Sequence, residues 1–256
     1  MSEFRRRLMS QVASDPDALP AGCVRLEYIE GTGTQWIDTE KLVSANEDIM
    51  LDYQYYGNIV DHTFMGWRWK TPQTSGNQLL FSIFSNGGLS FIYGTSNENA
   101  VRIDEAYRYT RNTLTISPNK KNVRFNNITL TGYDNTFTKA YNNGTSVYKC
   151  FLFTFNNVGS PIAACSTMRL YEYSLTDPQG NYTQHLIPIL DPQGVPCMYD
   201  TVAKKFHYNK GTGDFEFDKS SIVLPDGCIE LEYLKSNGES WISTEYIPQK
   251  GDALTF

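Results

Sequence analysis

The chain has 256 residues and a net charge of −6, from 22 Lys and Arg against 28 Asp and Glu. This balance excludes a broad basic footprint for nucleic acid outside the first few residues. No apolar run approaches the roughly 18–20 residues of a membrane-spanning helix, and the N-terminus lacks the apolar region of a secretory signal. With 17 Tyr and 14 Phe, the composition favours strands and turns.

The cysteines and histidines indicate no metal or redox site. Cys23, Cys150, Cys165, Cys197 and Cys228 are odd in number and widely spaced, with no C-x-x-C pair. The three histidines are scattered, without metal-ligand spacing. We expect buried free thiols in a protein that folds in a reducing cytoplasm, and no cofactor.

Residues 2–13 predict a short amphipathic helix, in which apolar residues recur every fourth position and share one face. A lone helix this short is marginal in water. Its apolar stripe is therefore expected either to pack on its own domain or to attach the chain to a larger assembly. The residues of this expected assembly arm are Phe4, Arg5, Arg6, Arg7, Leu8 and Val12.

One stretch occurs twice. Residues 19–40 recur as residues 224–245 without gaps, and 12 of the 22 positions are identical. We therefore predict three parts: an arm and linker over 1–18, one domain over 19–221, and the start of a second, incomplete copy over 222–256. The second copy is expected either to continue into a full module of a longer protein or to pair with another module or subunit.

Strand patterns fill the first domain. Val24, Leu26 and Tyr28 alternate with charged residues, as in a strand with one buried face. Ile49–Tyr55 alternates in the same way. A hairpin is predicted that joins residues 79–83 to 89–93, and a turn over Ser117–Asn122 is predicted between residues 114–116 and 123–125.

The second half of this domain predicts a central strand, two tight turns and a closing hairpin. Tyr148–Phe155 is almost continuously apolar, which is typical of a strand buried on both faces. Asp177–Gly180 and Asp191–Gly194 share the sequence Asp-Pro-Gln-Gly, a type I turn pattern, although the aspartates also leave calcium conceivable. Pro196–Phe217 predicts a hairpin that turns at Lys210–Gly213. Many short strands between turns indicate a β-sandwich, and the length favours a jelly roll.

Several segments together resemble a known family. The opening LPAGCVRLEYIEGTGTQWIDTE, Phe151–Phe153 followed by Asn156–Ser160, Met168–Tyr171 and the closing Val195–Phe215 resemble LamG-like, concanavalin A-like jelly-roll modules. Such modules occur in bacteriophage tail and fibre proteins and in surface proteins of gut bacteria. The resemblance implies an all-β, concanavalin A-like jelly roll, but this fold carries lectins, glycosidases and structural domains alike.

Catalytic signals are weak. The enzymatic branch of this fold resembles laminarinases, whose Glu-x-Asp-x-x-Glu motif is absent from this sequence. The nearest imitation is Asp214–Asp218, where alternating Phe residues indicate an amphipathic edge strand instead. A Ser nucleophile motif is also absent. We therefore expect a protein that is not an enzyme.

Aromatic and amide residues give the candidate ligand site. Trp67 and Trp69 share a strand face beside Arg68, and aromatic faces with such neighbours suit sugar rings, although the same pattern is typical of a core. Trp36 is expected in the core. The full candidate ligand-binding set is Trp67, Arg68, Trp69, Asn77, Tyr107, Tyr141 and Asn142.

From these features we expect a phage structural and recognition protein of the tail-fibre or head-fibre type. Its arm would contact other virion proteins, and its jelly roll would bind a host-surface glycan. The likeness to fibres favours a homo-oligomer made in the bacterial cytoplasm and located in the virion. The alternative is a secreted or surface carbohydrate-active enzyme or adhesin of a gut bacterium, located at the cell surface.

Overall fold

The computed structural model describes residues 19–57, 62–68, 78–83, 89–94, 109–118, 120–126, 128–130, 148–162 and 166–218. The chain divides after Val223 into two units, and every described residue belongs to the first. The predicted arm and the second copy of the repeat lie outside the described residues.

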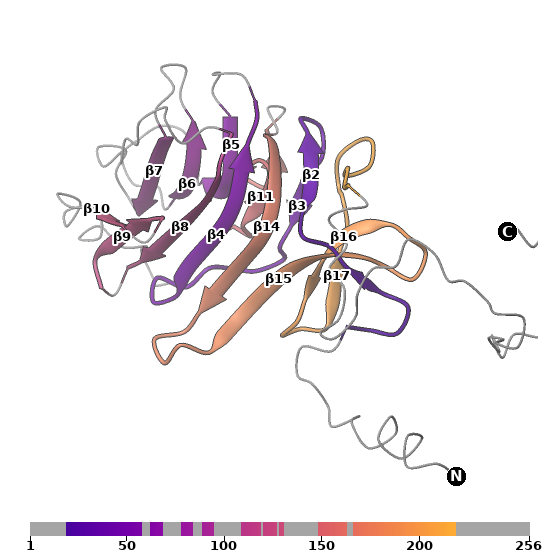
Figure 1. The fold of residues 1–256 in the computed structure, drawn as a ribbon. Helices are drawn as coiled ribbons and strands as arrows, with labels where there is room; N and C mark the ends of the chain where they lie inside the picture. Colours follow the sequence, from indigo (N-terminus) through magenta and orange to yellow (C-terminus); the bar gives the residue numbers. More distant parts are fainter. Residues whose placement is uncertain are drawn as a thin grey trace, which may run out of the picture. The chain divides into compact units, whose positions relative to one another are not determined.

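The described elements are all strands, arranged in two sheets (Figure 1). The ten-stranded sheet consists of β10 (Ile128–Leu130), β9 (Asn122–Phe125), β8 (Arg111–Ser117), β4 (Asp48–Tyr55), β14 (Thr167–Thr176), β15 (Tyr182–Leu190), β16 (Pro196–Asp200), β17 (Lys205–His207), β1 (Val24–Arg25) and β2 (Ile29–Thr32). The seven-stranded sheet consists of β13 (Ser160–Pro161), β12 (Asn156–Asn157), β5 (His62–Arg68), β11 (Phe151–Leu152), β3 (Ile37–Asp38), β6 (Gln78–Ile83) and β7 (Leu89–Gly94).

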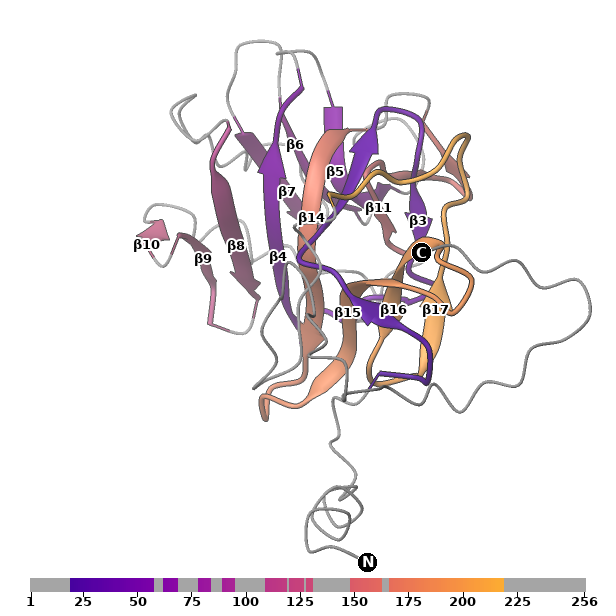
Figure 2. The same cartoon turned by 45° about the vertical axis from the view of Figure 1, so that its right-hand side comes forward.

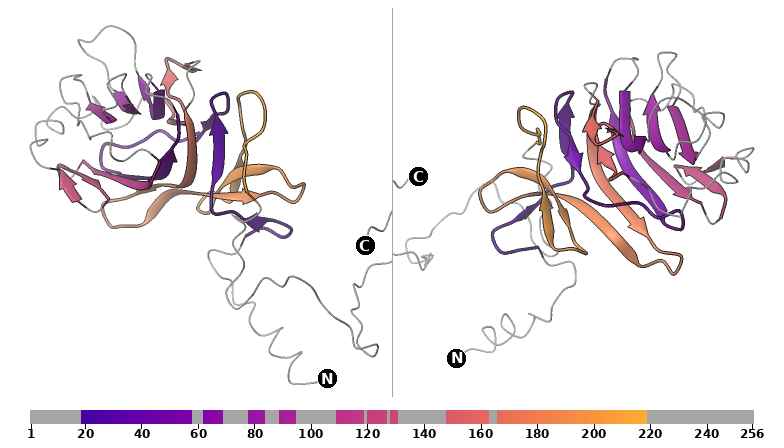
Figure 3. Two further views of the ribbon diagram at one scale, coloured as in Figure 1. Left: turned by 45° about the horizontal axis from the view of Figure 1, so that its top comes forward. Right: turned by 180° about the vertical axis from the view of Figure 1, so that it is seen from behind.

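The two sheets lie face to face, as the view from behind shows (Figure 3). Buried side chains from both sheets form one large core cluster. The alternation of β4 turns Ile49, Leu51, Tyr53 and Tyr55 inward. The Tyr53 ring lies 5.2 Å from the ring of Phe64 on β5, and thus joins the sheets. The predicted all-β sandwich is confirmed for the described residues, whereas its classification as a concanavalin A-like jelly roll stays a prediction.

The larger sheet divides at β14, whose two halves have different neighbours (Figure 2). Residues 167–170 pair with β2, and residues 173–176 pair with β15, while β4 runs along the other edge. Beyond this pairing, β15 carries β16 and β1. The β2 strand therefore occupies the place on β14 that β15 leaves.

The locally encoded pairings match the predictions. In the hairpin of β6 and β7, Ile83 faces Leu89 and Leu79 faces Tyr93. In the hairpin of β8 and β9, Ile116 faces Val123. Both hairpins join strands that are close in the sequence, so the alternation of apolar residues suffices to set the register.

Both Asp-Pro-Gln-Gly turns are built by turn chemistry, as predicted. The Gly180 N–H donates to the Asp177 carbonyl at 2.9 Å, and the Gly194 N–H donates to the Asp191 carbonyl at the same distance. Each aspartate carboxylate also accepts two backbone N–H groups of its own turn. The Asp191 carboxylate additionally accepts the Tyr208 hydroxyl at 2.9 Å. Among the residues that the structure describes, no group of three potential ligands could hold a metal ion.

Three sequence predictions need correction. The strand predicted over Tyr148–Phe155 is only β11, because Phe153 has φ of 68° and ends the pairing, although the segment is buried as expected. The closing hairpin joins β16 to β17 and turns at residues 201–204, not at Lys210–Gly213. The strand predicted over Val24–Tyr28 ends at Arg25 and restarts at Ile29.

Candidate functional site

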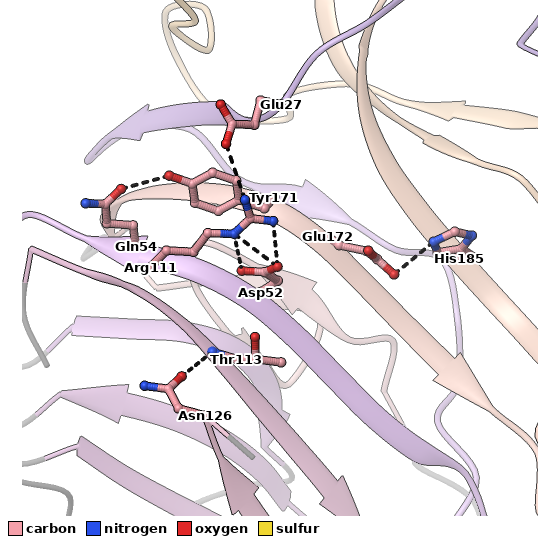
Figure 4. Close-up of polar contacts among 9 residues, drawn as sticks. All are labelled: Glu27, Asp52, Gln54, Arg111, Thr113, Asn126, Tyr171, Glu172 and His185. Carbon is pink, nitrogen blue, oxygen red and sulfur yellow. Dashed lines mark hydrogen bonds and ion pairs between the residues drawn. The ribbon is translucent and has the colours of Figure 1, made fainter. Parts of the chain in front are cut away.

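The candidate site lies on the outer face of the ten-stranded sheet (Figure 4). On β4, Asp52 and Gln54 alternate with the core residues and therefore point outward. Arg111 begins β8 on one side of β4, and Tyr171 lies in β14 on the other. At Tyr171 the register with β4 shifts, which is the sign of a β-bulge, and bulges re-aim side chains.

Arg111 is held over a tyrosine ring by two carboxylates. Its Nε and Nη2 atoms donate to Asp52 Oδ1 and Oδ2 at 3.0 and 2.8 Å, and its Nη1 donates to Glu27 Oε1 at 3.3 Å. The guanidinium carbon lies 4.0 Å from the centre of the Tyr171 ring. The Tyr171 hydroxyl donates to Gln54 Oε1 at 2.8 Å, so this ring is fixed as well (Figure 4).

Arg169 makes a second unit of the same kind on β14. Its Nε donates to Glu30 Oε2 at 2.7 Å. Its guanidinium carbon lies 4.2 Å from the Tyr28 ring centre and 4.9 Å from that of Tyr56. Cation–π contacts of this type hold an arginine in one orientation as well as adding energy.

The two units are in contact through their tyrosine rings. The rings of Tyr28 and Tyr171 meet edge to face, with centroids 5.5 Å apart. We call this surface the arginine–tyrosine face. It comprises Glu27, Tyr28, Glu30, Asp52, Gln54, Tyr56, Arg111, Arg169 and Tyr171.

An open depression adjoins Arg169. Its volume is about 380 Å³, and its lining adds Glu216, Phe217 and Asp218 to Tyr28, Glu30 and Arg169. The backbones of Glu216 and Glu30 exchange hydrogen bonds of 2.8 and 2.7 Å, which places the closing segment beside β2. The acidic stretch at 214–218 therefore supplies one wall of the depression, and Phe215 turns into the core.

Burial and pairing fix the charge states on the face. Burial raises the pKa of Tyr171 to about 12 and also raises the pKa of Tyr28 and of Tyr56. The hydrogen bonds to Asp52 raise the pKa of Arg111 further above neutrality. At physiological pH the face therefore presents neutral phenols and charged guanidinium groups.

Two of the residues predicted to bind a ligand, Trp67 and Arg68, are among the described residues. Trp67 is fully buried in the core, so the interpretation of its ring as a sugar platform is wrong and the core alternative holds. Arg68 is half-buried, and its guanidinium lies 5.6 Å from the Phe155 ring centre on the seven-stranded sheet. The other predicted ligand residues lie outside the described residues: Trp69, Asn77, Tyr107, Tyr141 and Asn142.

Two described thiols bear out the expectation for the cysteines. Cys150 and Cys197 are buried and unbonded to each other or to Cys23, which is half-buried. Burial raises the pKa of Cys150 and of Cys197 to about 12 each. Trp36 lies at the rim of the core, where its ring packs 4.5 Å from Phe151.

Sequence reasoning missed the arginine–tyrosine face, although parts of it carried a signal. Glu27 and Tyr28 stand inside the repeated stretch, and Arg169 and Tyr171 stand inside one of the segments that carry the family resemblance. Tyr28 was expected to share a face with Leu26. The break after Arg25 instead leaves Leu26 in the core and turns Tyr28 to the outer face, against Arg169.

Comparison with known proteins gives only distant likenesses. No family profile and no curated protein sequence matches the chain. A similar solved structure is the CBM40 of the Ruminococcus gnavus IT-sialidase, with 13% identity and a TM-score of 0.41 over 59% of this chain and 90% of that one. The same module bound to α2,3 sialyllactose has 14% identity and a TM-score of 0.38 over 58% and 90%. With α2,6 sialyllactose the values are 16%, 0.36, 58% and 89%.

These neighbours are carbohydrate-binding modules. Within the described residues, no helix is both long enough and apolar enough to cross a membrane.

Proposed function

We propose that residues 19–221 form a non-enzymatic, jelly-roll recognition module that binds glycans through the arginine–tyrosine face. In this proposal the module is displayed on a bacteriophage virion, as part of a tail or head fibre, and residues 1–18 attach it to other virion proteins. The geometry of the face supports the glycan-binding part. The virion part is supported by the resemblance of the sequence to phage fibre modules.

One observation carries the proposal: two guanidinium groups, paired with carboxylates from separate segments, are fixed over tyrosine rings on the outer face of the ten-stranded sheet. Neighbouring hydroxyls of a sugar ring match the paired donors and acceptors of guanidinium, carboxylate and amide groups. Because the protein already orders these groups, a ligand does not bear the entropy cost of ordering them.

Stability alone is a weak reason for such an arrangement. Arg111 and Glu27 are about half exposed, with 49% and 50% of their side-chain surface accessible. Exposed ion pairs of this kind contribute only about 0–1 kcal/mol, and exposed cation–π contacts about 0.5–1 kcal/mol. The pairing of Arg111 with Glu27 is therefore better explained by recognition than by stability.

The test is a screen of the full chain on an array of bacterial surface polysaccharides, followed by titration of the best ligand. Arg111→Ala is expected to weaken binding by roughly tenfold or more, as for a central contact. Arg111→Lys keeps the charge but loses the planar fork, so an intermediate affinity is expected. Lys120→Ala serves as the control, because Lys120 is an exposed, ion-paired cation at the far end of β4.

Three outcomes would contradict this part of the proposal: no binding to any glycan, full binding by the Arg111→Ala variant, or an equal loss in the Lys120→Ala variant. Cleavage of a bound glycan, measured as new reducing ends, would instead support the alternative function of a carbohydrate-active enzyme.

Immunogold labelling of particles tests the virion location. The double variant Phe4→Ser and Leu8→Ser is expected to reduce incorporation into particles, and unchanged incorporation would contradict an attaching arm.

A further inference from the structure

We infer that the arginine–tyrosine face selects glycans without acid groups and disfavours those that carry carboxylate, sulfate or phosphate. This inference rests on the proposed function and specifies its ligand class. It starts from the charges that lie on the face or line its depression. Among the described residues there, five carboxylates accompany two guanidinium groups, from Glu27, Glu30, Asp52, Glu216 and Asp218 against Arg111 and Arg169.

Both arginines are already neutralised by the protein. Arg169 forms an ion pair with Glu30 at 2.7 Å, and its guanidinium also contacts two tyrosine rings. Arg111 directs three of its five N–H groups to Asp52 and Glu27. A ligand carboxylate that took over either of these pairings would displace a protein carboxylate. Glu30 and Asp52 are only 21% and 15% accessible, so each would lose its counter-charge while partly buried, which is costly.

The two remaining N–H groups of Arg111 could reach a ligand without displacing a carboxylate. An acid group placed there would, however, stand beside Glu27 and Asp52 on the same guanidinium, three negative charges around one positive charge. A sugar hydroxyl accepts from the same N–H groups without this repulsion. It can also donate its own O–H to Glu27, which is half exposed. The face is thus rich in acceptors and suits a ligand rich in neutral donors.

The experiment compares matched glycans that differ by one acid group, with the full chain. A suitable pair is a hexose oligosaccharide and the same chain with one primary alcohol oxidised to the carboxylate of a uronic acid. The neutral member of each recognised pair is expected to bind roughly tenfold or more tightly, because like charges at an interface are strongly disfavoured. Added salt is expected to narrow this ratio, since it screens the repulsion.

A charge variant sharpens the test. In the double variant Glu216→Gln and Asp218→Asn, two of the five carboxylates lose their charge with little change of shape. The ratio of acidic to neutral affinity is expected to rise several-fold, whereas Lys204→Gln, at an exposed turn, should leave that ratio unchanged.

The possible failures are distinguishable. Equal or tighter binding of acidic glycans that Arg111→Ala weakens would overturn this inference and leave the proposed function standing. An unchanged ratio in the double variant would also overturn it. Binding to no glycan at all, or binding unaffected by Arg111→Ala, would overturn the proposed function and the inference together.

Discussion

The two sheets differ in how their outer faces are covered. On β4, every second residue is buried, and three of the four others (Asp48, Asp52 and Gln54) carry a charge or an amide, so one face remains available to a ligand. On β6, five of the six residues are buried, so both faces of this part of the seven-stranded sheet are covered. Trp67 lies in the covered sheet, whereas Tyr28 and Tyr171 lie beneath arginines on the available one. The polar residues between the aromatic ones are thus a better guide to a surface site than the aromatic residues themselves.

The largest effect expected from this difference concerns Gly66, on β5 of the covered sheet. A Cβ atom at this position would lie 1.9 Å from the backbone oxygen of Leu79, and backbone cannot yield as a flexible side chain does. Gly66→Ala is therefore expected to abolish soluble, folded protein, as measured by expression and circular dichroism.

The matched control is Gly159→Ala, because Gly159 also has a positive φ but has nothing within 4 Å of the added Cβ. It should lose only about 1–2 kcal/mol, the usual cost of a left-handed conformation. Similar behaviour of the two variants would show that β5 is not tightly enclosed.

Trp67→Ala is expected to have the next largest effect. Removal of this fully buried ring should lower the free energy of unfolding by about 3–5 kcal/mol, measured by chemical denaturation. The folded fraction of this variant should still bind the glycan that the wild type binds. Unchanged stability with lost binding would show instead that the Trp67 ring contacts the ligand and that the ligand binds the seven-stranded sheet.

Tyr171→Phe should have the smallest effect, on the available face. It removes the hydrogen bond to Gln54, which contributes about 1 kcal/mol. The folded pKa of Tyr171 is about 12, above the unfolded value near 10. Its contribution to stability is therefore complete below pH 10 and is lost as the pH rises toward 12. Denaturation curves from pH 8 to 11 should show a weaker alkaline dependence in the variant than in the wild type.

Tyr208, whose pKa burial and Asp191 also raise to about 12, provides the comparison. The variant Tyr208→Phe should change the alkaline dependence in the same direction but leave glycan binding intact. If Tyr171→Phe leaves the alkaline dependence unchanged, the phenol is not held as the structure places it.

The parts of the fold that the sequence predicts are those with local causes. The two hairpins follow from alternation over neighbouring strands, and the turns at Asp177 and Asp191 follow from the chemistry of four consecutive residues. Tyr148–Phe155 misled because an apolar run reports burial without reporting backbone conformation. The positive φ of Phe153 ends β11, and a phenylalanine at this position does not predict a positive φ.

The site could not be predicted in the same way, because its contacts are distant in sequence. Arg111 meets a carboxylate 59 residues away in Asp52 and another 84 residues away in Glu27. Arg169 meets Glu30 across 139 residues. In one sequence each of these residues looks like an ordinary charge on a strand. The local sequence around Trp67 indicated a binding site more strongly, but whether the Trp67 ring is buried depends on how the two sheets pack.

The pairing of Glu30 with Glu216 has a consequence for the order in which the chain folds. The same closure includes hydrogen bonds from Thr34 and Gln35 to partners 178 and 179 residues later. During synthesis, the first strands therefore cannot form these hydrogen bonds until almost the whole module has emerged from the ribosome, which makes folding slow. The repeated opening at 224–245 emerges only afterwards. Because translation delivers residues 19–40 first, the earlier copy can reach the closing segment before the second copy, which shares 12 of its 22 residues, has emerged.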